Sequence, residues 1–548
     1  MLTNSPGRAR AASMSEAAWM VTETDVSSRA VARSGSAGRF SSLMFPWTRE
    51  AIRRDTGTQP DCFTDLNLDQ VVDAIVARQD EAILRPYFYS RYPDEEVVRY
   101  RLSIFRDVDR PDVLPVVTSF CEDMRRVRLA LDYAARTFAL RHRQMVVLEA
   151  RSLYCSAVVN LHQRLASVPL GSPGLCALRS YLERYLASVR FSALKQETAG
   201  VEAALSGVAY GMLFRKDKVT VRRYAEEEDY TQRVNDRFER FSEYEAPAAP
   251  ERRFNDYGLN HIEEVILSFA ADLFPASFQP LSDYVGRHTN FIDDVLATVE
   301  RELGFFIAYL AYIAPLRKRG LPFCYPTVSA TCKDVCATGA FDLALAHKLA
   351  ARNESVVSND FYLRGHERIL LVSGPNQGGK TTFARMVGQL HFLAGLGCPV
   401  PGVQAQLFLA DRIYTHFERA EDVARLRSKL EDELIRLKAT CTAMTAQSVV
   451  ILNEVFNATS LEDQILLSTR ILQKLLAGDV LGVCVSFIDT LAALDPKIVS
   501  MVTAVARDDP ARRTFRIERR PADGLAYALS LAQKHGVTYE RLRARIRS

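Results

Sequence analysis

The stretch "ILLVSGPNQGGKTTFARM", residues 369–386, constrains the fold of this chain more than any other. An apolar run typical of a buried strand leads into a glycine-rich turn, and amphipathic residues continue the chain. Residues 374–381 fit the pattern G-x-x-x-x-G-K-[S/T] at every fixed position. Such a loop turns its backbone N–H groups and the start of the next helix towards phosphate. The sequence therefore predicts a strand, a phosphate-binding loop and a helix, in that order.

This loop predicts a site for a nucleoside triphosphate with Mg²⁺. In loops of this type the lysine, here Lys380, neutralises the β- and γ-phosphates, and the hydroxyl of Thr381 ligates the cation. The residues expected to surround the nucleotide are Gly374, Pro375, Asn376, Gln377, Gly378, Gly379, Lys380, Thr381 and Thr382.

A second apolar run, "SVVILNE" at residues 448–454, ends in a polar pair. In phosphate-loop enzymes the first residue of this pair is a carboxylate in the magnesium shell, and the second polarises the attacking water. Here the pair is Asn453 and Glu454, so Glu454 is the candidate general base. Asn453 is the second candidate metal ligand, and it offers only a neutral acceptor. We therefore expect ATP hydrolysis to be slow.

The pattern along the chain divides it into three parts. Residues 1–45 are rich in Ser, Ala, Gly and Arg without periodic apolar positions, which predicts a disordered tail or a start codon placed too early. In residues 46–321 the apolar residues recur every three or four positions, which predicts long helices, interrupted by a loop at 167–174 and a short strand or hairpin at 216–224. Residues 322–548 alternate apolar runs with amphipathic helices, the pattern of a doubly wound α/β domain, and the continuous apolar runs at 368–373, 448–454 and 481–487 predict strands that are covered on both faces.

Composition describes a soluble globular chain, with 48% hydrophobic residues and a formal net charge of +4. This balance is not strongly basic, so contact with nucleic acid would need local clusters such as residues 215–223 or 512–520, although such clusters are more often solvated charge. The ten cysteines follow no signal peptide and indicate reduced thiols in a cytoplasmic protein. Cys324, Cys332 and Cys336 lack a fourth ligand for zinc. The apolar run at 303–316 is too short to cross a membrane.

These motifs together resemble the MutS mismatch-repair ATPases, which belong with the ABC-type P-loop ATPases. The family's "GPNMGGKST" appears as "GPNQGGKTT", and its upstream N-D-x-x-L appears as Asn359–Leu363. Its composite-site signature, Ser-x-Phe-x-x-Glu, corresponds to residues 428–433. Residues 86–108 and 524–545 resemble the family's core segment and its C-terminal helices near the dimer contact.

The resemblance implies an α+α/β architecture, with a long helical lever and core domain followed by an ABC-type P-loop ATPase domain. It implies ATP and Mg²⁺ as ligands and a homodimer in which Ser428 reaches the γ-phosphate bound by the partner. The levers of such a dimer clamp double-stranded or branched DNA, and repair proteins receive the signal. The expected function is thus an ATP-dependent DNA clamp in repair or recombination control, with no membrane involvement.

Several departures from the family pattern keep two alternatives open. Phe487 stands where the family has a switch histidine, residues 457–463 replace a glycine-rich loop, and little chain precedes Cys62 for a mismatch-reading domain. These features resemble short bacterial members that lack that domain. The first alternative is a nucleotide-gated dimeric scaffold that hydrolyses little ATP and recruits partner proteins. The second is an ABC-type ATPase that serves something other than DNA.

Overall fold

The computed structural model describes residues 40–46, 58–77, 81–216, 218–224, 258–288, 290–418, 428–505 and 513–521, with isolated positions between 538 and 543. The chain divides into two compact units, Met1–Phe40 and Ser41–Ser548. The architecture below is that of the second unit. Most of the predicted tail and most of the C-terminal stretch 524–545 lie outside the described residues.

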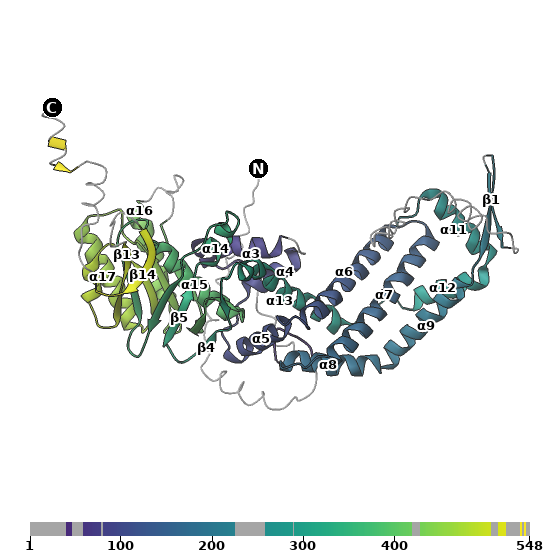
Figure 1. Ribbon diagram of the computed structural model, residues 1–548, viewed down its shortest axis with the longest axis horizontal. Coiled ribbons are helices and arrows are strands. Elements are labelled where there is room, and N and C mark those ends of the chain that lie inside the picture. Colours follow the sequence, from purple (N-terminus) through teal and green to yellow (C-terminus); the bar gives the residue numbers. More distant parts are fainter. Residues whose placement is uncertain are drawn as a thin grey trace, which may run out of the picture. The chain divides into compact units, whose positions relative to one another are not determined.

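Helices form most of the second unit up to residue 318, which confirms the predicted helical pattern (Figure 1). A first group comprises α2 (Cys62–Leu66), α3 (Leu68–Val76), α4 (Glu81–Tyr89) and α5 (Glu95–Val108). The longer ones are α6 (Leu114–Arg136), α7 (Leu140–Ala166), α8 (Pro173–Leu186), α9 (Val189–Ser206), α11 (His261–Leu273), α12 (Pro275–Arg287) and α13 (Asp294–Lys318). α6 and α7 lie side by side after a short turn, and the apolar run at 303–316 is buried within α13.

The predicted hairpin is present but begins earlier than the sequence pattern indicated. β1 (Tyr210–Arg215) pairs in antiparallel fashion with β2 (Lys218–Arg223), and Arg215 lies opposite Lys218. Arg223 donates hydrogen bonds to the carbonyl oxygen of Leu273 and so ties the hairpin to the end of α11. The basic turn of the hairpin therefore projects from the end of α9 while its base is attached to a helix.

A buried arginine joins two of the long helices. Arg151 of α7 is almost completely buried and donates hydrogen bonds to the carbonyl oxygens of Tyr284 and Val285, at 3.1 Å in both cases, and to that of His288. These carbonyls lie at the C-terminal end of α12, where helical partners run out and a cation is favourable. The guanidinium thus supplies hydrogen-bond donors, from within the core, to the carbonyl oxygens at the end of α12.

A short N-terminal strap is built into the second unit. Ser42 donates a hydrogen bond from Oγ to Oε1 of Glu302 at 2.8 Å, and the N–H of Leu43 donates to Oε2 at 2.6 Å. Tyr100 donates to the carbonyl oxygen of Ser42 at 2.9 Å. Ser42, Leu43 and Met44 are buried, as is Glu302 on α13. A buried carboxylate needs such donors, so the last residues of the stretch predicted as a tail contribute to the core.

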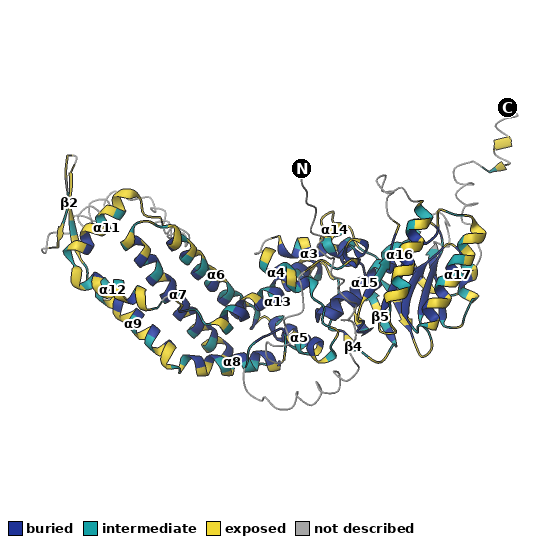
Figure 2. Ribbon diagram, turned by 180° about the vertical axis from the view of Figure 1, so that it is seen from behind, coloured by how far each residue is buried: buried dark blue, intermediate teal, exposed yellow. Residues whose placement is uncertain are grey.

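The C-terminal half of the second unit is built on a mostly parallel six-stranded sheet, in the order β10-β11-β12-β7-β13-β14. Only β14 runs antiparallel to its neighbour within this sheet. The strands are β7 (Ile369–Ser373), β10 (Ile413–His416), β11 (Val449–Asn453), β12 (Leu481–Val485), β13 (Ile498–Val505) and β14 (Arg513–Arg519). Every residue of β7, β11 and β12 is buried, which confirms the three strands predicted from continuous apolar runs (Figure 2).

A smaller four-stranded sheet, in the order β4-β9-β5-β6, was not predicted from the sequence. Its strands are β4 (Thr327–Ser329), β5 (Val335–Ala340), β6 (Asn359–Leu363) and β9 (Gln404–Phe408); β3 (Phe323–Cys324) pairs separately with β8 (Val400–Pro401). The helices of this half are α14 (Leu343–Ala350), α15 (Lys380–Leu396), α16 (Lys429–Ala443) and α17 (Leu461–Ala477). Within the described ranges, no helix is long and apolar enough to cross a membrane.

The strap predicts a sharp difference between two truncated chains. A chain that starts at Ser41 retains the donors to Glu302, and we expect its thermal stability to match that of the full chain. A chain that starts at Phe45 loses those donors and the two buried apolar side chains of Leu43 and Met44, which lowers the free energy of unfolding by at least about 3 kcal/mol. Denaturant unfolding of both chains measures this difference, and equal stabilities would contradict the role of the strap.

Candidate functional site

The loop predicted to bind phosphate lies between β7 and α15, which confirms the predicted order of strand, loop and helix. Gly374 has a φ of 123° and Gly379 a φ of 94°, values that residues other than glycine rarely adopt. A Cβ at Gly374 would also lie 1.9 Å from Oγ1 of Thr503 on β13. The two glycines are therefore required by backbone geometry, and they let the loop close around the N-terminus of α15.

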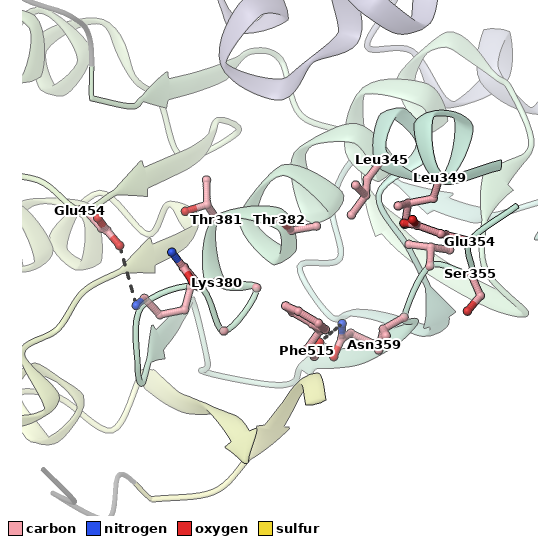
Figure 3. Close-up of a pocket in the computed structure, with 15 residues that line it drawn as sticks. Leu345, Leu349, Glu354, Ser355, Asn359, Lys380, Thr381, Thr382, Glu454 and Phe515 are labelled. Atoms are coloured by element: carbon pink, nitrogen blue, oxygen red, sulfur yellow. Dashed lines mark hydrogen bonds and ion pairs between the residues drawn. The ribbon is translucent and has the colours of Figure 1, made fainter. Parts of the chain in front are cut away.

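A cavity of about 480 Å³ opens beside this loop (Figure 3). Its lining residues from the loop and the start of α15 are Gln377, Gly378, Gly379, Lys380, Thr381 and Thr382. Among the predicted nucleotide-binding residues, Gly374, Pro375 and Asn376 do not line it. Glu454 lies beside Lys380 at this end. Leu345 and Leu349 of α14 lie on the far side together with Glu354 and Ser355, and Phe515 lies next to the loop. The cavity thus extends from the predicted phosphate loop, past an aromatic ring, to a far side that carries both apolar and polar residues.

The ammonium group of Lys380 lies at the polar end. Its Nζ donates hydrogen bonds to the carbonyl oxygens of Gly374 at 2.9 Å and Pro375 at 3.2 Å. It also lies 3.8 Å from Oε1 of Glu454 and 4.1 Å from the centroid of the Phe487 ring. Burial lowers the pKa of Lys380, and the Glu454 carboxylate opposes that shift. The lysine is thus held beside the loop by weak contacts that phosphate oxygens can replace.

Glu454 follows β11 on a strained backbone. Its φ is 53° and that of Phe456 is 62°, both in the left-handed region that non-glycine residues seldom adopt. Each such residue costs of order 1–3 kcal/mol, and strain of this kind clusters at functional sites. The N–H of Glu454 donates to the carbonyl oxygen of Val485 at 3.0 Å, so the residue continues the pairing of β11 with β12. The carboxylate is thereby directed towards Lys380.

Asn453 precedes it and carries an unsatisfied acceptor. Its side chain is buried, and within the described part of the chain its Oδ1 has no hydrogen-bond partner. Buried acceptors of this kind call for a ligand, an ion or a water. No group of three or more His, Cys, Asp or Glu side chains that could hold a metal occurs among the described residues. A cation here would therefore depend on phosphate oxygens in addition to Thr381 and Asn453.

Ser428 does not line this cavity. It is the N-cap of α16, where its Oγ accepts a hydrogen bond from the N–H of Glu431 at 3.2 Å, and it is exposed. The structure therefore does not bring Ser428 together with Lys380 and Glu454 of the same chain. The role of Ser428 in a partner's site stays a prediction.

Phe515 is a cavity residue that the sequence reasoning missed. It has a φ of 58°, its side chain is 49% exposed, and its Cδ1 lies 3.7 Å from the position of a Cβ on Gly379. Asn359 holds this part of β14 in place: its Nδ2 donates to the carbonyl oxygen of Phe515 at 3.2 Å, and its Oδ1 accepts from the N–H of Ile517 at 2.7 Å. A half-exposed aromatic ring on a strained backbone, beside a phosphate loop, suits stacking on a flat base.

Two other aromatic residues, on β6 next to Asn359, have a packing role. Phe361 is buried and meets Phe383 of α15 edge to face, with centroids 6.0 Å apart. Tyr362 lies against the guanidinium groups of Arg364 and Arg519. Neither lines the cavity.

Comparison with known proteins adds a family to this geometry. Residues 370–515 match the family model "MutS domain V". The chain is similar to the DNA mismatch repair protein MutS 2 of Halobacterium salinarum, with 29% identity over 198 residues, 35% of this chain and 23% of the relative. It is 30% identical over 201 residues to the DNA mismatch repair protein MutS of Chloroflexus aurantiacus, 35% of this chain and 20% of the relative. The protein of the same name from Orientia tsutsugamushi is 35% identical over 117 residues, 21% of this chain and 13% of the relative.

The matched region contains most of the candidate site. It begins within β7 and ends at Phe515, so it includes Lys380, Ser428, Asn453 and Glu454. MutS domain V is the ATPase domain of its family, so residues 370–515 of this chain are similar to that family's ATPase domain. The aligned part spans less than a quarter of the length of each of these relatives.

The exposed ring of Phe515 leads to a prediction about nucleotide affinity. We expect Phe515→Ala to weaken ATP binding about tenfold, because stacking of a base on an aromatic ring contributes about 1–3 kcal/mol. Phe515→Tyr keeps the ring and serves as the matched control, with affinity close to that of the unaltered protein. Equilibrium nucleotide binding measures both variants. Unchanged affinity in Phe515→Ala would place the base elsewhere.

Proposed function

We propose that this protein is an ATP-dependent, DNA-binding clamp of the MutS family that acts in DNA repair or recombination control. The observation that carries the proposal is the cavity itself. A phosphate loop with glycines at positive φ, Lys380 and Glu454 form one end, the Phe515 ring lies beside the loop, and the surrounding residues match MutS domain V.

Nucleotide binding would use groups that the structure leaves accessible. The N–H groups of the loop and the start of α15 face the triphosphate, and the Lys380 ammonium exchanges its carbonyl contacts for the β- and γ-phosphate oxygens. Thr381 and Asn453 would hold Mg²⁺, which supplies positive charge to the phosphates when bound. The unsatisfied Oδ1 of Asn453 fits this role, although as a neutral ligand it binds the cation less strongly than a carboxylate.

Hydrolysis would depend on Glu454 as the general base. Without nucleotide its carboxylate lies 3.8 Å from Lys380. Once Lys380 turns to the phosphates, Glu454 is free to accept a proton from the attacking water. The Phe487 ring lies over the same ammonium and offers the water no hydrogen bond. Together with the neutral Asn453, this favours slow turnover.

The function would require a homodimer. Ser428 and the N-terminal N–H groups of α16 are outside the cavity of their own chain, yet a helix N-terminus capped by a hydroxyl suits an anion. We therefore propose that Ser428 contacts the γ-phosphate bound by a second copy. Closure of the two sites on ATP would then move the helical regions with respect to each other.

DNA contact is proposed for the exposed turn of the β1–β2 hairpin. Arg215, Lys216 and Lys218 are exposed around this turn, and Arg223 anchors the hairpin to α11. Three cations on an anchored hairpin suit the closely spaced phosphates of a duplex better than dispersed surface charge does. The partner in this proposal is double-stranded or branched DNA, and repair proteins would receive the signal.

The nucleotide-gated scaffold remains the second candidate, because Asn453 and Phe487 both disfavour rapid hydrolysis. An ABC-type ATPase that serves another partner is the third. Tight ATP binding without appreciable turnover would favour the scaffold, whereas turnover that ignores DNA would favour the third.

The first prediction concerns turnover. We expect steady-state ATP hydrolysis to be slow and to be stimulated by one of three DNA forms: homoduplex, mismatched or branched. Glu454→Ala abolishes the activity and serves as the blank, because it removes the general base while the phosphate loop remains. A flat response to all three DNA forms would contradict a DNA-coupled ATPase.

The second prediction concerns the hairpin. Replacing Arg215, Lys216 and Lys218 together by Ala should weaken DNA binding without changing the affinity for ATP. Loss of up to three phosphate contacts also lowers the slope of log K against log salt by about 2 to 3, since each contact contributes about 0.9. Binding is measured over a range of salt concentrations. The matched control replaces Lys348 and Lys438 by Ala, and an equal effect there would remove the hairpin from the proposed contact.

A further inference from the structure

We propose that Glu433 of α16 is a positioning residue that holds the backbone of the general base Glu454. This inference rests on the proposed ATPase function and deepens it. Glu433 is only 3% exposed, and its Oε2 accepts a hydrogen bond from the N–H of Phe456 at 3.1 Å. The contact joins α16 to the segment that follows β11, two residues beyond Glu454.

The segment that Glu433 holds is the strained one. Glu454 and Phe456 both have a positive φ, at 53° and 62°. Three hydrogen bonds hold this segment: the N–H of Glu454 donates to Val485 on β12, Nε2 of Gln464 on α17 donates to the carbonyl oxygen of Val455 at 3.1 Å, and the N–H of Phe456 donates to Glu433. A left-handed backbone at two non-glycine residues persists only when its surroundings hold it. Of the three, the bond to Glu433 is the one that fixes the second strained residue, and without it the segment can relax and carry the carboxylate of Glu454 away from Lys380.

Packing alone does not account for a carboxylate at this position. Leu430 and Leu437 lie three residues before and four after Glu433, on the same face of α16, and both pack against the core cluster that contains Val455 and Phe456. An apolar residue at 433 would complete that face, whereas burial of a carboxylate costs desolvation free energy. The acceptor for the Phe456 N–H is the contribution that a leucine cannot make.

The charge of Glu433 has basic neighbours. Nε2 of His416, at the end of β10, lies 4.0 Å from Oε1 of Glu433. Arg436, one turn further along α16, lies with an Nη2 atom 3.2 Å from the same His416 nitrogen and is paired with Asp432. Arg436 thus brings positive charge into the surroundings of the buried carboxylate, whose Oε2 accepts from the loop.

The same helix begins at Ser428, five residues before Glu433. If Ser428 contacts the nucleotide of the second copy, as proposed above, a displacement of the start of α16 reaches Phe456 through one side chain. The geometry therefore points to a route by which occupancy of one site sets the general base of the other. Ser428 senses the partner's nucleotide, and Glu433 transmits its position to Glu454 of the same chain.

The test compares three variants of the full-length protein in steady-state kinetics, with nucleotide affinity measured separately. Glu433→Leu removes the acceptor, and we expect kcat to fall at least about tenfold while KM and ATP affinity stay within about twofold. Glu433→Gln keeps a side-chain oxygen that can accept from Phe456, so its kcat stays near that of the unaltered protein. Leu437→Ala, the matched control, removes packing on the same helix face; it lowers the melting temperature but not kcat.

Hydrogen exchange of the 454–457 backbone supplies the structural readout. Protection there should be lost in Glu433→Leu and retained in Glu433→Gln and Leu437→Ala. A kcat for Glu433→Leu equal to that of the unaltered protein, or an equal fall in Leu437→Ala, would overturn the positioning role. Should Glu433→Leu fail to fold, Glu433→Gln still decides, because a tenfold loss of kcat there contradicts the acceptor role. Absence of ATPase activity in the unaltered protein would refute the proposed function instead.

Discussion

The burial of α15 is the constraint on which the rest of the structure depends. This helix is buried along most of its length, and its two ends serve different parts of the molecule. Lys380 at its start belongs to the phosphate site, while residues further along hold the first helices of the chain. Arg385 donates to the carbonyl oxygen of Asp65 at 2.9 Å, and Gln389 donates to that of Leu66 at 2.8 Å. A helix that is buried on nearly all sides cannot move independently of its neighbours, so the loop before α15 and α2 are held together.

The middle of α15 shows how close that packing is. A Cβ at Gly388 would lie 2.6 Å from side-chain atoms of both Ile451 on β11 and Leu66 on α2. Gln389 beside it accepts from the N–H of Leu343, at the start of α14, which lines the far side of the cavity. Three elements thus meet within one turn of α15: β11, which leads to Glu454, α14, and α2 of the helical region. A displacement of α15 would therefore displace all three.

Sequence reasoning succeeded where one local pattern determines the outcome. β7, β11 and β12 are buried on both faces, so their continuous apolar runs identified them, and the spacing of glycines around Lys380 identified the loop. It failed where distant segments meet. Phe515 lines the cavity because Asn359, more than 150 residues earlier, brackets its strand, and the strap at Ser42 has no periodicity because it pairs with Glu302. The short strands of the second sheet were missed because a few residues each carry too little pattern.

Glu433 is a residue that the sequence identified but could not explain. It matched the glutamate of the family signature, but that match gives no reason for a charged residue on a buried helix face. The reason lies in the N–H of Phe456, which a strained segment places there and which only an acceptor from α16 satisfies. In the proposed function, the neutral Asn453 and the Phe487 ring would bind metal and water only weakly, while the hydrogen bonds at residues 454–456 keep the position of Glu454. A general base that is held in place beside weak metal and water ligands would suit slow, controlled turnover, because a strained backbone persists only where its surroundings hold it.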